Sequence, residues 1–222
     1  MSKKSRGDKG EALVIDELKK IKDYYRVIND ATLINKNSEM SHQIDHILIH
    51  PHGIFIIETK NYYGEIFYED GRWNRLIKNK IEKLPDPFRQ NKSHAITLRK
   101  ALKGKYEFIP VVVFVKNNVP YTGDENAINL NDLLLFIDSY PYTYKLRKEE
   151  IDKIYEEINR NISSISKEEH VENIKYLKAV NKELRKEKEY AITTGICPRC
   201  GSKLKINDNS FFCLKCGYKF TL

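Results

Sequence analysis

Two acidic side chains and a lysine in the first half of the chain have the residue types and the spacing of a cation site. Twelve residues separate Asp45 from Glu58, and Lys60 follows two residues later. Carboxylate oxygens are the ligands that hard divalent cations such as Mg²⁺ prefer. These three residues therefore predict a divalent-cation site, provided that the fold brings their side chains together.

Residues 43–61 predict a β-hairpin that would bring these three side chains together. Apolar residues alternate through its first half and run unbroken through its second, and both halves are rich in β-branched types. A proline and a glycine between them suit a type I turn. With a four-residue loop Ile49 faces Ile54, and Asp45 lies opposite Glu58. A loop one residue shorter would slip the register and put the aspartate on the other face. We prefer the longer loop because it also aligns the isoleucines.

The carboxylates of Asp45 and Glu58 would repel each other in this register. Side chains that face each other across two strands have Cβ atoms only about 4.5–5.5 Å apart, and like charges placed there are destabilising. A bound divalent cation would cancel that repulsion. Lys60 projects from the same face as Glu58, because side chains alternate along a strand with a period of two.

These residues resemble the PD-(D/E)xK nuclease signature, with Ile44 where that signature often has proline. The surroundings narrow the resemblance to the nuclease-related domain, called NERD, over about residues 7–118. The ordered motifs that carry it are Gly10-Glu11, Gln43-Ile44-Asp45-His46, Glu58-Thr59-Lys60 and Pro87-x-x-Gln90.

The resemblance implies a Mg²⁺- or Mn²⁺-dependent nuclease that hydrolyses DNA phosphodiester bonds. Asp45 and Glu58, with the carbonyl of Thr59, would hold the metal. Lys60 would position or deprotonate the attacking water and stabilise the developing charge. Glu11 would orient the site or hold a second ion, and Gln90 would be a supporting polar group.

The order of the predicted elements agrees with a restriction-endonuclease-like α/β core, in which the order α-β-β-β-α-β builds a mixed central sheet. They are a helix over 8–22, a strand over 24–34, the central hairpin, a second hairpin over 64–75, a helix from Asp86 to Gly104 and a buried strand over 109–115. Glu11 stands near the start of the first helix on its apolar stripe. It either caps that helix or points into the site.

Two Cys-x-x-Cys pairs, each followed by glycine, lie in the last 26 residues and predict a four-thiolate Zn²⁺ site in a small zinc ribbon. The ligands would be Cys197, Cys200, Cys213 and Cys216. The tail resembles the zinc ribbons of bacterial type I topoisomerases, although those usually have a longer gap in the second pair. Its basic residues are candidates for nucleic-acid contact: Arg199, Lys203, Lys205, Lys215 and Lys219. Aromatic residues among them could stack on single strands or form the core of the ribbon.

The whole chain divides into a nuclease-like domain (1–130), a helical extension (131–190) and the ribbon (191–222). Its formal charge of +8 favours a polyanionic partner such as DNA. The longest apolar run is far shorter than the roughly 20 residues that span a membrane. The first residues lack the apolar stretch of a signal peptide, so we expect a cytoplasmic protein. Residues 166–190 could form a helical arm, a dimerisation seam or a helix lying on the core.

Two other functions remain open at this stage. The first is a non-catalytic DNA-binding or regulatory protein that uses a nuclease fold, since fold alone does not confer activity. The second is a topoisomerase-associated zinc-finger protein, which depends on the tail alone.

Overall fold

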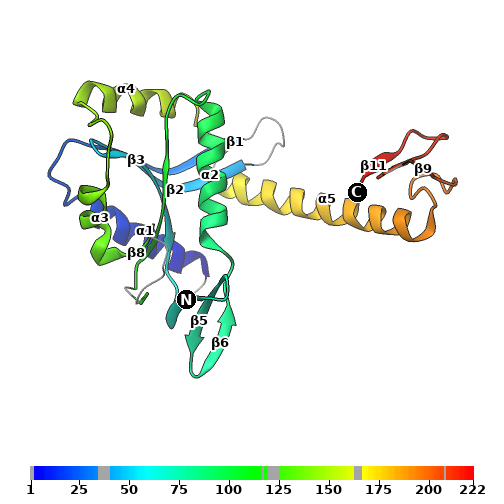
Figure 1. Cartoon of the computed structure of the whole chain (residues 1–222), viewed down its shortest axis with the longest axis horizontal. Helices are drawn as coiled ribbons and strands as arrows, with labels where there is room; N and C mark the ends of the chain where they lie inside the picture. Colours follow the sequence, from blue (N-terminus) through cyan, green and yellow to red (C-terminus); the bar gives the residue numbers. More distant parts are fainter. Residues whose placement is uncertain (1–2, 35–40, 117, 120–125, 163–166, 208) are drawn as a thin grey trace. The chain divides into compact units, whose positions relative to one another are not determined.

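The computed structural model describes residues 3–34, 41–116, 118–119, 126–162, 167–207 and 209–222 (Figure 1). The chain forms two compact units, Met1–Ser166 and Lys167–Leu222. The predicted boundaries after residues 130 and 190 stay a prediction. Among the described helices, none is both long and apolar enough to cross a membrane.

The first unit is built on a mixed five-stranded sheet in the order β1-β2-β3-β7-β8 (Figure 1). Strands β1, β2 and β3 are antiparallel, whereas β3, β7 and β8 run parallel. Their bounds are Arg26–Ile34, Ser41–His50, Gly53–Lys60, Ile109–Phe114 and Ala127–Asn129. The α/β nuclease-like core predicted from the sequence is confirmed.

The central hairpin β2–β3 has the register that aligns the isoleucines. Ile49 pairs with Ile54, and the ladder extends from His50 with Gly53 at the turn to His46 with Ile57. The slipped register of the shorter loop is therefore wrong. The predicted loop of four residues is also wrong, because His50 already pairs with Gly53 and only Pro51 and His52 join the strands. The side chains of one hairpin face pack into a single core cluster, which includes Ile47, Ile49, Ile54 and Ile56.

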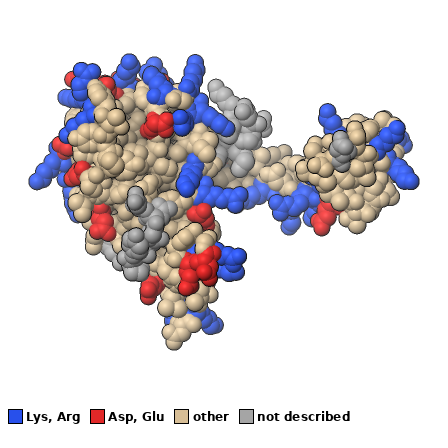
Figure 2. Space-filling view, in the orientation of Figure 1, with Lys and Arg blue, Asp and Glu red and all other residues tan. Residues whose placement is uncertain are grey.

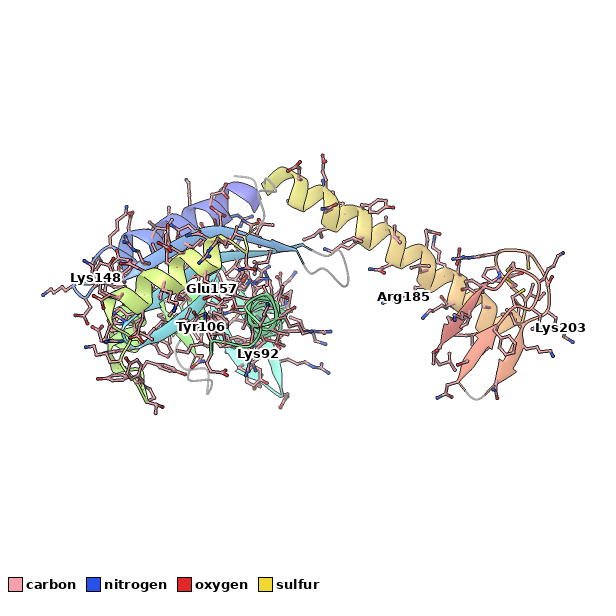
Figure 3. All side chains as sticks on the ribbon, turned by 90° about the horizontal axis from the view of Figure 1, so that it is seen from above. Lys92, Tyr106, Lys148, Glu157, Arg185 and Lys203 are labelled. Atoms are coloured by element: carbon pink, nitrogen blue, oxygen red, sulfur yellow. The ribbon has the colours of Figure 1, made fainter. Side chains whose placement is uncertain are left out.

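Helices cover both faces of the sheet. Helices α2 (Pro87–Ala101) and α4 (Lys148–Asn159) pack on the isoleucine face, to which they contribute Leu98, Ile151, Ile154 and Ile158, and Leu102 directly after α2 joins them. Helices α1 (Lys3–Leu18) and α3 (Leu133–Ser139) pack on the other face with Val14, Leu18, Leu133 and Ile137. The view from above in Figure 3 shows the sheet between α1 on one side and α2 and α4 on the other.

Helix α2 begins and ends as its sequence predicts. The Asp86 carboxylate accepts a hydrogen bond from the backbone N–H of Phe88 at 2.9 Å, and Pro87 takes the first helical position. The chain leaves the helix through Gly104, whose φ of +71° favours glycine.

A small sheet of β4 (Glu65–Glu69), β5 (Arg72–Ile77) and β6 (Lys80–Lys83) is inserted between β3 and α2. Its first two strands form the hairpin predicted over 64–75, and Asp70 and Gly71 make the turn with φ values of 50° and 72°. The third strand was not predicted. It follows a second tight turn at Lys78 and Asn79, which also have positive φ.

The second unit contains α5 (Lys167–Thr194) and a three-stranded sheet of β9 (Lys205–Asn207), β10 (Ser210–Phe212) and β11 (Lys219–Thr221). The end of α5 packs on the sheet through buried Ala191. Lys188 also lies over the Phe220 ring at 5.4 Å. The helix and the small sheet therefore share one core.

Candidate active site and cysteine cluster

The carboxylates of Asp45 and Glu58 lie where the β2–β3 ladder ends. The last backbone pair is His46 with Ile57. Beyond it, the Asp45 Oδ2 accepts a hydrogen bond from the backbone N–H of Thr59 at 2.8 Å. Glu58 is 3% exposed. The hairpin thus brings the two acidic groups together at one end of the isoleucine face.

Both carboxylic acids hold their protons more tightly than usual. Burial raises the pKa of Asp45 to about 7, and the negative charge of Glu58 adds to the effect. Burial also raises the pKa of Glu58 against the opposing pull of Lys60, and the charge of Glu11 contributes. A bound cation would favour the ionised forms of both groups.

Lys60 supplies a positive charge at this point. Its Nζ donates a hydrogen bond to the Glu58 Oε1 at 2.5 Å and lies 3.5 Å from the Gln90 Oε1. Burial lowers the pKa of Lys60, but Glu58, Tyr62 and Asp45 outweigh it, so the net shift is upward. The lysine is therefore a fixed cation at neutral pH.

Helix α2 contributes two polar side chains on the site side. Gln90, which was predicted to be a supporting polar group, has its Oε1 3.5 Å from the Lys60 Nζ. His94, one turn later, is 4% exposed, and its Nδ1 lies 3.7 Å from the Glu58 Oε2. His94 was not among the predicted site residues. The i, i+4 spacing from Gln90 was the signal that could have found it.

Glu11 reaches the site because α1 passes close to the end of β3. A Cβ on Gly10 would lie 3.1 Å from the Cβ of Asn61 and 3.2 Å from the Cγ2 of Thr59, so glycine permits the approach. The Asn61 Nδ2 also donates a hydrogen bond to the Arg6 carbonyl at 2.8 Å. Helix α1 already begins at Lys3. Glu11 is thus inside the helix, and the capping alternative is wrong.

A divalent cation fits this group of residues. The Glu58 Oε2 is buried and has no hydrogen-bond partner among the described residues. A buried, unpaired carboxylate oxygen is costly unless something compensates it. The oxygen lies at the same end of the hairpin as the Asp45 carboxylate. The two groups therefore offer oxygen ligands to a hard cation.

Comparison with known proteins shows the family of this chain. Residues 6–115 match the model of the nuclease-related domain. The chain belongs to the nuclease-related domain family. It is also 31% identical over 183 residues to an uncharacterized protein of Bacillus anthracis. The match covers 78% of this chain and 84% of that protein. No solved structure matches the chain.

The nuclease-related domain contains all five residues predicted for its site. The structure brings Asp45, Glu58, Lys60 and Gln90 into one group, and Glu11 is close enough to raise the pKa of Glu58. Their catalytic roles stay a prediction.

The second unit of this family member carries the four cysteines in one cluster. The Sγ atoms of Cys197, Cys200, Cys213 and Cys216 all lie within 4.8 Å of one another. Cys197 and Cys216 are 3.5 Å apart, as are Cys200 and Cys213. Four thiolates at about 2.3 Å from a tetrahedral Zn²⁺ would be separated by roughly 3.8 Å. The cluster is compatible with Zn²⁺.

The two cysteine pairs have the same backbone geometry. The N–H of the first cysteine in each pair donates to the carbonyl five residues on, from Cys197 to Ser202 and from Cys213 to Tyr218. The following glycine donates back to the first cysteine and has φ near +70° (68° at Gly201, 75° at Gly217). These glycines are the turn residues that the sequence pattern predicted.

The five predicted cations of the ribbon are all exposed, but three of the four aromatics among them, at 211–220, are buried and not available for stacking. The exposed cations are Arg199, Lys203, Lys205, Lys215 and Lys219. Phe211, Tyr218 and Phe220 are buried in the core of the small sheet. Phe212 is half-buried. Of the four, the sequence analysis could not tell which would form the core.

Proposed function

We propose that this protein is a divalent-metal-dependent nuclease that hydrolyses DNA phosphodiester bonds. The observation that carries the proposal is the grouping of Asp45, Glu58 and Lys60 at the end of one hairpin. Two carboxylates that repel each other beside a fixed cation are poorly suited to a purely structural role. They suit a site that binds a metal ion and a phosphate.

The carboxylates of Asp45 and Glu58, with the carbonyl of Thr59, would hold Mg²⁺ or Mn²⁺. When bound, the ion would polarise the scissile phosphate and lower the pKa of a water molecule. The backbone N–H of Thr59 orients the Asp45 carboxylate by its 2.8 Å hydrogen bond. The charge of Glu11 would add to the attraction for the metal.

Lys60 would stabilise the negative charge that develops on the phosphate. Its raised pKa keeps it protonated, which favours this role over removal of a proton from water. Gln90 would hold the ammonium group in place through its Oε1. The buried ring of His94 would fix the orientation of the Glu58 carboxylate.

The second unit would bind Zn²⁺ through its four cysteines and present its exposed cations to DNA. The aromatic residues of the ribbon itself are mainly buried, so phosphate contacts would contribute more to its binding than base stacking would. Such contacts are largely independent of sequence.

The test is a cleavage assay on single-stranded, duplex and branched DNA, with Mg²⁺, with Mn²⁺ and without added metal. We expect metal-dependent cleavage by the wild-type protein. Lys60→Ala should reduce the rate at least about 100-fold, as expected for the loss of transition-state stabilisation. Lys22→Ala, which removes an exposed lysine beyond α1, is the matched control and should cleave like wild type.

A protein that binds DNA but cleaves none of these substrates with either metal would contradict the proposal. That result would favour the non-catalytic DNA-binding alternative. Equal activity of Lys60→Ala and wild type would refute the role given to the lysine.

A further inference from the structure

The outer face of α2 carries cations and no carboxylate. The sequence of the helix, Pro87–Ala101, contains no Asp or Glu. Five cations in and just after it are exposed and recur at helical spacing on the side away from the core: Arg89, Lys92, Arg99, Lys100 and Lys103. We call these five residues the α2 cation row.

Most of the row is not neutralised by neighbouring acids. Arg99 pairs with Glu107 at 2.7 Å. The other four cations make no ion pair with a residue that the structure describes, although Lys92 lies over the Phe88 ring at 5.8 Å. A solvated helix face usually mixes charges of both signs, because opposite charges three or four residues apart stabilise a helix.

In this row the neighbours have the same sign. Within the helix, Arg89 and Lys92 are three residues apart and Arg99 and Lys100 are adjacent, and Lys103 follows just beyond the helix end. Like charges three or four residues apart destabilise a helix. A bound polyanion would remove this cost. The row is therefore better explained by a partner than by solubility alone.

The row connects the candidate active site with a second basic region. Arg89 is adjacent to Gln90, which lies 3.5 Å from Lys60. At the other end, beyond Lys103, Lys105 lines an open hollow of about 490 Å³ between the end of α2 and α4. In Figure 2, Lys and Arg side chains gather along the upper edge of this unit, over α4 and the end of α2.

The hollow carries a net positive charge. Its lining residues are Lys105, Lys153, Glu157, Arg160 and Asn161. The carboxylate of Glu157 is already engaged, because it accepts hydrogen bonds from Lys105 at 2.6 Å and from the Tyr106 hydroxyl at 2.8 Å. Figure 3 shows Tyr106 and Glu157 between α4 and α2. Lys153 thus remains to contact an anion, and so do the terminal nitrogens of Arg160, whose Nε donates to the Glu156 carbonyl at 3.2 Å.

We propose that the α2 cation row binds the phosphate backbone of the DNA that flanks the cleaved bond, and that the hollow accepts a phosphate at its far end. This inference rests on the proposed nuclease function. From Arg89 to Lys103 the helical rise amounts to roughly 20 Å. One strand of a duplex carries about six phosphates over that length. The row would thus guide the DNA along α2 on one side of the active site.

The experiment compares two triple variants of the full-length protein that lose the same charge. One carries Lys92→Gln, Lys100→Gln and Lys103→Gln in the row. The control carries Lys19→Gln, Lys20→Gln and Lys22→Gln at the end of α1, which packs on the other face of the sheet. Binding of a fluorescently labelled 30-base-pair duplex is measured by anisotropy between about 50 and 200 mM salt, without added divalent metal.

Each phosphate contact contributes about 0.9 to the slope of log affinity against log salt. We expect the row variant to lose about two to three units of slope, and to bind at least about tenfold more weakly at 100 mM salt. The control should keep the slope of the wild type.

Three results would overturn the inference. If the wild type binds DNA normally and the row variant has an unchanged slope, the row does not contact the DNA. That result would not contradict the proposed nuclease function. An equal loss of slope in both variants would show that positive charge anywhere on the surface contributes to DNA binding, and not the row in particular. A wild-type protein that binds no DNA would contradict both the row and the proposed function.

Discussion

The two facing carboxylates should make the metal-free protein less stable than it could be, and Asp45→Asn should reveal this. Asparagine is nearly the same size as aspartate and keeps an oxygen that can accept the hydrogen bond from the Thr59 N–H. It removes the charge that burial and Glu58 disfavour. We therefore expect this variant to be more stable than wild type at pH 8 without metal.

The size of the effect follows from the pKa of Asp45, which rises from 3.8 to about 7 on folding. Below pH 4 the group is protonated in both states and costs nothing. Between pH 4 and 7 it ionises in the unfolded chain while the folded protein keeps the proton, so the free energy of unfolding falls by about 1.4 kcal/mol per pH unit. Above pH 7 the loss is complete, at roughly 4 kcal/mol.

Some of that cost is relieved when Lys60 and Glu58 rearrange, so we expect Asp45→Asn to gain about 2–4 kcal/mol at pH 8 and almost nothing at pH 4. The assay is urea unfolding followed by the fluorescence of Trp73, the single tryptophan of the chain. Because Trp73 is buried in the first unit, its signal reports that unit. Asp16→Asn, on the exposed side of α1, is the control.

Metal provides the second half of this test. Mg²⁺ at one hundred times its Kd should stabilise the wild-type protein by about 2.7 kcal/mol. It should stabilise Asp45→Asn much less, because an amide is a weaker ligand than a carboxylate. A variant that is no more stable than wild type at pH 8, or whose advantage does not change with pH, would refute the reasoning about the carboxylate pair.

Three further predictions concern other parts of the molecule. Gly10→Ala should destabilise the first unit by about 1 kcal/mol or more and reduce cleavage, because the added Cβ would press on Thr59 and Asn61. Alanine usually favours a helix, so a gain in stability would contradict this prediction. Thermal unfolding and the cleavage rate measure the two effects. Cys213→Ser should lower bound zinc from about one equivalent to near zero, measured by elemental analysis, while the Trp73 unfolding curve stays unchanged. His94→Ala should lower the cleavage rate about tenfold or more. His94→Gln should keep a higher cleavage rate than His94→Ala if the ring acts by holding Glu58. Equal rates in both variants and wild type would exclude that role.

The hairpin and the cysteine cluster were predictable because their signals are local. The alternation of apolar residues and the proline and glycine of the turn set the β2–β3 register without information from distant residues. Each Cys-x-x-Cys-Gly motif similarly determines its own turn. Local chemistry therefore located Asp45, Glu58 and all four cysteines.

The contributions of the helices were harder to predict, because they depend on how distant elements pack. The i, i+4 spacing puts His94 on the same face of α2 as Gln90, but only the docking of the helix on the sheet brings its ring beside Glu58. The start of α1 at Lys3 also changed the interpretation of Glu11, because polar residues in the first turns of a helix give no apolar periodicity. Likewise, only packing decides which aromatic residues enter the core of the ribbon.

The location of the acidic pair on one hairpin has a consequence for the kinetics of folding. Asp45 and Glu58 are 13 positions apart, whereas Lys60 and Gln90 are 30 apart. Closing the longer segment costs roughly 0.7 kcal/mol more in chain entropy, and the inserted sheet must be accommodated as well. The hairpin should therefore form early, and α2 should dock on it later. Substitutions that weaken the pairing of Ile47 and Ile56 should then mainly slow folding, and those under α2, at Leu98, should mainly accelerate unfolding.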